Sequence, residues 1–336
     1  MSARENVNIP SGNEEEADHR PLVLVHRLPR FVLPFDMRTT FRLLDPISSA
    51  ADEPPQDFLS RHAPSIRALI TVGPAPVNAD LLDLLPSVRL VVGSSAGVDH
   101  IDLNECRRRG IAVTNAGSAF SEDVADYAVA LLLDVFRRIS AADRFVRSGS
   151  WPRKPEYPLG FKLGGKRVGI VGLGSIGSEV AKRLVAFGCR IAYNSRNKKP
   201  SAPYTYHANV CDLAVNSDVI VVCCALTKET HHIINKDVMT GLGKGGVIIN
   251  VGRGALIDEK ELVQYLTRGE IGGAGLDLFE KEPDVPKELF TLDNVVLSPH
   301  RAGLTTESFE AVREVITANL NAFFSNKPLL SPVQYE

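Results

Sequence analysis

The sequence predicts an α/β protein built from two doubly wound domains, and three observations support this. Short apolar runs of strand length alternate with helix-like segments, a pattern typical of parallel sheets covered on both faces. The alternation occurs in two stretches, which a long apolar helix separates. The length of 336 residues fits about two domains of roughly 150 residues each.

The first alternating stretch predicts a flavodoxin-like domain that begins at residue 21. Each of its strands is a short apolar run bounded by proline or polar residues. Strands are predicted at residues 22–25, 68–72, 90–92 and 111–114, with helices at residues 79–85 and 103–109. Residues 1–20 are polar, and we predict that they form a disordered tail.

A long helix is predicted next, over residues 121–147. Ser121 is expected to cap it, and Glu122 and Asp123 suit the positive end of the helix dipole. Its apolar residues are so dense that the helix needs partners on several sides. We therefore expect it to pack against a second subunit in a homodimer. A loop rich in proline and aromatic residues follows over residues 151–162.

The second alternating stretch predicts a dinucleotide-binding type of doubly wound domain over residues 121–300. Strands are predicted at residues 167–171, 190–193, 219–224, 247–251, 273–278 and 295–297, with helices at residues 178–187 and 259–267. A last helix, over residues 308–324, is expected to return to the first domain. That domain would then be discontinuous, with residues 21–120 and 301–336.

Composition excludes several classes of protein. The net charge of −2 comes without a basic stripe, so nucleic-acid binding is not expected. No apolar stretch reaches the roughly 20 residues of a membrane span. The five cysteines are odd in number and form no CxxC pair, which favours reduced thiols over disulfides or a metal site. The acidic N-terminal segment differs from an Arg-rich transit peptide, so we expect a cytoplasmic protein.

A dinucleotide fingerprint, GxGxxG, lies between a predicted strand and a predicted helix, the context that makes it specific. Its glycines allow a tight turn and the close approach of backbone to pyrophosphate, and the helix N-terminus attracts the negative charge. The predicted contacts are Gly172, Leu173, Gly174, Ser175, Ile176 and Gly177.

The end of the next strand favours NADPH over NADH. An enzyme that uses NAD normally places an acidic residue there to bind the ribose hydroxyls. This chain has Asn194 and Ser195 at that point, followed by Arg196. Ser195 can donate a hydrogen bond to a 2′-phosphate, and Arg196 can pair with it.

Three polar residues follow predicted strands of the second domain: Arg253 in NVGRG, Glu282 in FEKEP and His300 in SPHRAG. The carboxyl ends of parallel strands line one crevice, so we expect the three side chains to face the nicotinamide together. A histidine can protonate a developing alkoxide, and a neighbouring carboxylate favours its charged form. An arginine can hold a carboxylate and polarise a ketone. The sequence thus predicts a catalytic set for keto-acid reduction.

The motifs GLGSIG, NVGRG, GGAGLDLFEKEP and NVVLSPH together make the chain resemble the D-isomer-specific 2-hydroxyacid dehydrogenase family. The resemblance covers almost everything after the tail and is strongest to plant hydroxypyruvate, glyoxylate and hydroxyphenylpyruvate reductases, which use NADPH. It implies reduction of a small 2-keto acid to the D-2-hydroxy acid. It also assigns roles to single residues.

In that family's pattern Arg253 binds substrate, Glu282 supports the histidine and His300 is the acid/base. The resemblance implies that the amides of Ala96 and Gly97 bind the substrate carboxylate, and that Trp151 reaches the active site of a partner subunit. Two further cofactor contacts are predicted, by Val251 and by Asp277, the latter with the nicotinamide amide.

Two other functions stay open at this point. Corepressors of the C-terminal-binding-protein type use the same fold as a dinucleotide sensor, and formate dehydrogenases share the architecture. The complete set of Arg253, Glu282 and His300 favours a reductase over both. Arg301 departs from the small or apolar residue found in many relatives, and the sequence does not decide among hydroxypyruvate, glyoxylate and hydroxyphenylpyruvate.

Overall fold

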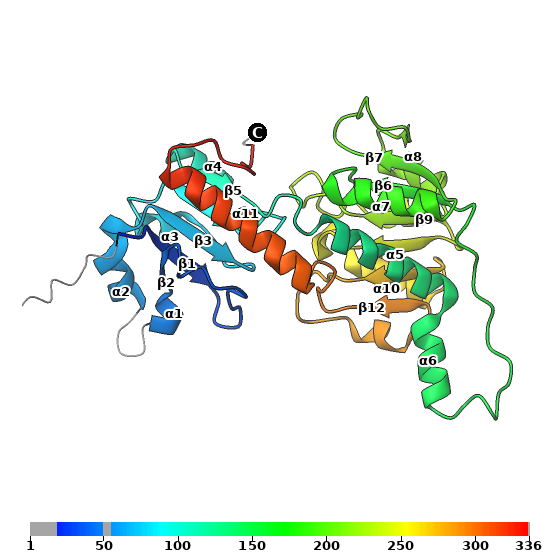
Figure 1. Cartoon of the computed structure of the whole chain (residues 1–336). Coiled ribbons are helices and arrows are strands. Elements are labelled where there is room, and N and C mark those ends of the chain that lie inside the picture. Colours follow the sequence, from blue (N-terminus) through cyan, green and yellow to red (C-terminus); the bar gives the residue numbers. More distant parts are fainter. Residues whose placement is uncertain (1–18, 50–54, 335–336) are drawn as a thin grey trace, which may run out of the picture.

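The computed structural model, which describes residues 19–49 and 55–334, contains two parallel sheets with helices packed on their faces (Figure 1). The predicted α/β class with two doubly wound sheets is confirmed. The predicted tail lies almost entirely outside the described residues. Among the helices that are described, none is both long and apolar enough to cross a bilayer.

The first sheet has five strands in the order β2-β1-β3-β4-β5, which is the flavodoxin-like order. Its strands are β1 (Leu22–Arg27), β2 (Arg42–Leu44), β3 (Ala68–Val72), β4 (Leu90–Gly93) and β5 (Ala112–Thr114). Its helices are α1 (Pro46–Ser49), α2 (Pro55–His62), α3 (Ala79–Asp83) and α4 (Leu103–Arg108). Strands β1 and β3 to β5 lie where the apolar runs predict them, whereas β2, with three residues, is too short to be recognised.

The second sheet has seven strands in the order β12-β11-β10-β9-β6-β7-β8. The strands are β6 (Arg167–Val171), β7 (Arg190–Asn194), β8 (Thr205–Tyr206), β9 (Val219–Val222), β10 (Val247–Asn250), β11 (Gly273–Leu276) and β12 (Val295–Leu297). The helices are α7 (Ser175–Ala186), α8 (Val210–Val215), α9 (Lys236–Leu242) and α10 (Glu259–Thr267). The order reverses between β6 and β9, and open parallel sheets bind ligands at such a point.

The prediction of one linking helix over residues 121–147 is wrong in two respects. The helix is broken at Arg138, which has a left-handed φ of 55°, into α5 (Ser121–Arg137) and α6 (Ile139–Arg147). The break is stable because the Asp134 carboxylate accepts a 2.8 Å hydrogen bond from the amide of Ser140 and thereby starts a new helix. Ser121 is not the cap: Phe120 holds that position, and the Ser121 side chain is buried.

The last helix, α11 (Thr306–Phe324), packs on the first sheet, as predicted (Figure 1). Its buried face shares a core with residues of β1, β3 and β4. The chain therefore passes between the two sheets twice, before α5 and before α11. These crossings support the predicted domain boundaries near residues 120 and 301, which remain a proposal.

Candidate active site

The three predicted catalytic residues follow three neighbouring strands. Arg253 comes after β10, Glu282 after β11 and His300 after β12. The register aligns Asn250 with Leu276 and Leu276 with Leu297, so the three strands end side by side. All three side chains thus leave the same edge of the sheet.

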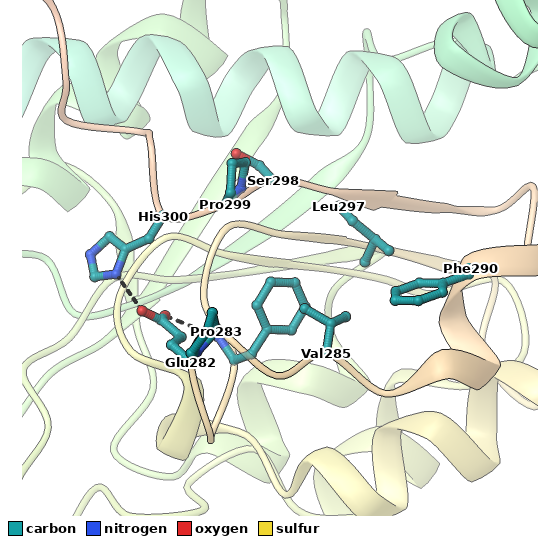
Figure 2. A pocket seen from close by; sticks show the side chains of 9 residues that line it. Glu282, Pro283, Val285, Phe290, Leu297, Ser298, Pro299 and His300 are labelled. Carbon is teal, nitrogen blue, oxygen red and sulfur yellow. Dashed lines mark hydrogen bonds and ion pairs between the residues drawn. The ribbon is translucent and has the colours of Figure 1, made fainter. Parts of the chain in front are cut away.

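His300 and Glu282 are joined by a hydrogen bond. The distance from His300 Nδ1 to Glu282 Oε2 is 2.8 Å. The pair borders one end of a hollow of about 270 Å³, and apolar side chains such as Val285, Leu297 and Phe290 line the rest of it (Figure 2). The bond to Nδ1 fixes the ring and leaves Nε2 as the nitrogen that can exchange a proton with a substrate.

The hydrogen bond also decides the charge of Glu282. Burial by itself raises the pKa of this carboxyl. The hydrogen bond and charge of His300, with the hydrogen bond from the Phe279 amide and the charge of Arg253, together outweigh burial. The net result is a pKa below the ordinary value of 4.5. Glu282 is therefore an ionised acceptor near neutral pH, which is the form that stabilises an imidazolium.

Asp277 has a structural role that sequence reasoning missed. It is 1% exposed, and its carboxylate accepts hydrogen bonds from Ser298 Oγ at 2.6 Å and from the amides of Arg301 at 2.7 Å and Ala302 at 2.9 Å. These bonds hold the segment on both sides of His300, whose backbone has a left-handed φ of 55°. A carboxylate has about four acceptor positions, so one remains for the predicted nicotinamide contact.

Arg253 is presented by a braced turn. The Asn250 side chain accepts a 3.0 Å hydrogen bond from the amide of Gly252 and donates a 2.9 Å bond to the carbonyl of Arg253. The guanidinium itself donates from Nε to Asp99 at 3.0 Å, across the junction of the two domains. Asn250 belongs to the motif NVGRG, and Asp99 follows Ala96 and Gly97 in the segment SSAGVDH. The sequence alone did not predict the contacts that either side chain makes.

The structure places Gly97 beside Arg253; both residues are predicted to bind the substrate. A methyl group built on Gly97 would lie only 1.9 Å from Arg253 Nη2. Within the part of the chain that the structure describes, the amides of Ala96 and Gly97 donate to no protein acceptor. Backbone amides without a protein acceptor and a nearby guanidinium are donors of the kind that bind a carboxylate.

Trp151 does not join these residues within one chain. It is 59% exposed and follows α6, which projects from the second domain on the side away from the first sheet (Figure 1). Its predicted contact with substrate therefore requires a second subunit.

The GxGxxG loop forms a cradle that fits a pyrophosphate. Gly172 has a φ of 99°, and a methyl group on Gly177 would lie 2.1 Å from the Gly172 carbonyl oxygen, so neither position accepts a larger residue. A methyl group on Gly174 would meet nothing within 4 Å, which shows open space above the start of α7. The helix begins at Ser175 rather than at the predicted residue 178. The amides of Ser175 and Ile176 can therefore bind an anion.

The turn after β7 carries the residues predicted to select NADPH. Ser195 donates from its hydroxyl to the Asn197 carbonyl at 2.7 Å, and Tyr206 donates to the Ser195 carbonyl at 3.2 Å. These bonds brace the turn, and Arg196 and Lys198 are exposed on it. Val251, after β10, is 6% exposed, and its amide donates to the Val222 carbonyl. Its own carbonyl and its side chain are therefore the groups left for contact with a cofactor.

Comparison with known proteins decides the family. Residues 129–302 match the description "D-isomer specific 2-hydroxyacid dehydrogenase, NAD binding domain". The chain belongs to the D-isomer-specific 2-hydroxyacid dehydrogenase family. The predicted resemblance is thereby confirmed, and the dinucleotide cradle is that of a 2-hydroxyacid dehydrogenase.

Individual relatives of this dehydrogenase cover nearly its whole length. A glyoxylate/hydroxypyruvate reductase of Arabidopsis thaliana is 58% identical over 96% of this chain and 99% of its own. A hydroxyphenylpyruvate reductase of Plectranthus scutellarioides is 50% identical over 83% of this chain and 88% of its own. Among solved structures, an NADPH-dependent glyoxylate/hydroxypyruvate reductase of Sinorhizobium meliloti, in complex with NADP and malonate, is 36% identical. It has a TM-score of 0.82 and covers 94% of this chain and 97% of its own.

The close contact at Gly97 gives a first prediction. In Gly97→Ala the new methyl group displaces the Arg253 guanidinium, so the KM for a 2-keto acid should rise by a factor on the order of 10 to 100. The KM for NADPH should not change, because the GxGxxG cradle is untouched. Steady-state kinetics measure both. Gly245→Ala is the matched control, since a methyl group there meets nothing within 4 Å; equal effects of the two substitutions would contradict the assigned site.

Proposed function

We propose that this protein reduces a small 2-keto acid to the D-2-hydroxy acid with NADPH as the electron donor. The observation that carries the proposal is the contact between Arg253 and Gly97, whose loop carries the two unpaired amides. The His300–Glu282 pair lies at the same edge of the sheet as Arg253. Hydroxypyruvate, glyoxylate and hydroxyphenylpyruvate are the proposed substrates, because relatives at 58% and 50% identity are named for them.

The substrate carboxylate is bound at the junction of the domains. The amides of Ala96 and Gly97 donate to it, and Arg253 Nη2, directed at Gly97, adds a charged donor. A guanidinium also stabilises the negative charge that develops on the keto oxygen. The first domain thus holds the unreactive end of the substrate, and the second domain acts on the reacting carbon.

Proton transfer belongs to His300. When bound, NADPH supplies the hydride that reaches the keto carbon. The resulting alkoxide takes a proton from His300 Nε2, while the ionised Glu282 keeps the ring oriented through Nδ1. Trp151 of the partner subunit would close the site from outside.

The cradle of Gly172 to Gly177 would hold the cofactor, and Val251 and Asp277 would also contact it. The turn after β7 would meet the adenosine end, and no carboxylate follows the strand there to repel a 2′-phosphate. The Ser195 hydroxyl would exchange its bond to the Asn197 carbonyl for one to that phosphate, and Arg196 would pair with the phosphate. The pairing favours NADPH over NADH.

We also propose that the protein forms a homodimer and that it is located in the cytoplasm. Large apolar side chains stay exposed on α6 and the loop after it: Ile139, Val146, Trp151, Leu159 and Phe161 are 53 to 92% exposed. An apolar patch of this kind is typical of a subunit interface. Neither nucleic acid nor a membrane is a proposed partner, and fractionation of cells that express a tagged chain would test the location.

The central experiment is the initial rate of cofactor oxidation with hydroxypyruvate, glyoxylate and 4-hydroxyphenylpyruvate. We expect turnover with NADPH and a lower kcat/KM with NADH. Arg196→Ala should raise the KM for NADPH and leave that for NADH unchanged, because only NADPH carries the 2′-phosphate. Binding of NADPH without turnover of any of the three acids would contradict the proposal and favour a dinucleotide sensor.

The His300–Glu282 pair predicts two further effects. His300→Ala should lower kcat by a factor on the order of 10² to 10⁴. In Glu282→Gln the ionised acceptor that holds the His300 ring through Nδ1 is lost, so kcat should also fall, by less than in His300→Ala. Retention of full kcat in His300→Ala would exclude the mechanism.

The sign of the linked stability effect follows from the lowered pKa of Glu282. The ionised carboxylate stabilises the fold above the ordinary pKa of 4.5, and this contribution is lost as the pH falls through the lower pKa of the folded state. Urea titrations should therefore show that wild type and Glu282→Gln differ most in stability above that pH and converge under more acidic conditions.

A charged substitution within the exposed apolar patch tests the proposed dimer. Leu159→Asp should shift the protein toward monomer in sedimentation equilibrium, because a charge would be buried in the interface. Leu330→Asp, at an equally apolar position that is 61% exposed but lies outside the patch, is the control. A monomeric wild type would refute the proposed assembly.

A further inference from the structure

Asp99 is an acidic residue placed beside the site proposed for an anionic substrate. It lies after β4 in the first domain, and its Oδ1 accepts a 3.0 Å hydrogen bond from Nε of Arg253 in the second domain. The two side chains are 32% and 27% exposed, so the contact is partly shielded from water. A carboxylate next to an anion-binding site repels the anion. The position of Asp99 therefore needs an explanation other than direct contact with the substrate.

The hydrogen bonds of Arg253 provide that explanation. A guanidinium has five N–H donors. Nε donates to Asp99, and Nη1 donates one hydrogen to the Gly252 carbonyl at 2.9 Å. Three N–H donors on Nη1 and Nη2 remain, and donors of this kind pair with a carboxylate or with adjacent carboxylate and keto oxygens.

The guanidinium also lies close to the loop of Ala96 and Gly97. Both Arg253 Nη2 and Asp99 Oδ1 lie within 2.8 Å of the position that a methyl group on Gly97 would occupy. The guanidinium is therefore held against the loop that carries the unpaired amides. Gly252 belongs to the same turn as Arg253 and cannot fix it relative to the other domain, whereas Asp99 can.

We propose that Asp99 is a positioning residue, which holds the Arg253 guanidinium across the domain junction so that its Nη1–Nη2 edge faces the amides of Ala96 and Gly97. It acts as a hydrogen-bond acceptor, and its negative charge is incidental. This inference rests on the proposed keto-acid reduction, because Arg253 must meet a substrate for its position to matter. A flexible arginine that loses this anchor must be ordered by the substrate itself, at a cost to binding.

A competing role for Asp99 predicts the opposite result. If Asp99 occupied Arg253 in place of the substrate, its removal would free the guanidinium and lower the KM. The geometry argues against this, since Asp99 uses Nε and leaves the Nη1–Nη2 edge open.

The test compares Asp99→Ala with Asp99→Asn. Alanine removes the acceptor, so the KM for hydroxypyruvate should rise by a factor on the order of 10 to 100, with a smaller fall in kcat and an unchanged KM for NADPH. Asparagine keeps an acceptor oxygen for Nε, so its KM should stay within about threefold of the wild type. Binding of oxamate, an anionic keto-acid analogue that accepts no hydride, should weaken in parallel when NADPH-loaded protein is titrated by calorimetry.

Asp102→Ala is the matched control in the same loop. Asp102 caps α4 by accepting a 2.9 Å hydrogen bond from the amide of Glu105, so its loss should lower the Tm without changing the KM. An unchanged or lower KM in Asp99→Ala overturns the inference, as does an Asp99→Asn variant as impaired as Asp99→Ala, or an equal rise in KM in Asp102→Ala. A wild type without keto-acid turnover would instead contradict the proposed function.

Discussion

The backbone hydrogen bonds that pair β10 with β11 and β11 with β12 fix where the reacting side chains lie. Parallel strands in register end at one edge, and each of the three loops that leave this edge carries one polar residue of the site. Arg253, Glu282 and His300 are far apart in the chain but need only short loops to meet. The Gly-rich loop after β6 opens at the same edge, so cofactor and acid/base share one side of the sheet.

The conformation of the loop that carries His300 at that edge depends on buried polar groups rather than on apolar packing. Asp277 is nearly inaccessible to water, and a buried carboxylate is costly unless hydrogen bonds compensate it. Its three donors do so, and in return they define the path of the chain on both sides of His300. A left-handed residue other than glycine costs on the order of 1 to 3 kcal/mol, which this anchoring offsets. Tyr127 extends the network from α5 through Ser298.

Local chemistry explains which parts of the fold were predictable. Strands such as β3 and β12 are continuous apolar runs bounded by turn residues, so their limits can be read directly. The predicted ends of β9 and β10 ran too far because the apolar run continues into residues such as Cys223 and Val251, which lie in loops at the ligand edge. The break at Arg138 escaped prediction because Asp134 and Ser140 fit a continuous helix equally well as surface residues. Only their contact starts a new helix.

The sequence by itself determined the α/β class, the dinucleotide fingerprint and the proposed catalytic trio, because each depends on residue types in a recognisable local pattern. The tertiary structure alone decided which groups brace that trio. Asp99 meets Arg253 and Asp277 holds the turn of His300 through contacts between segments that are remote in sequence. No periodicity or spacing encodes such contacts, since they exist only after two sheets have packed and brought unrelated loops within hydrogen-bond distance.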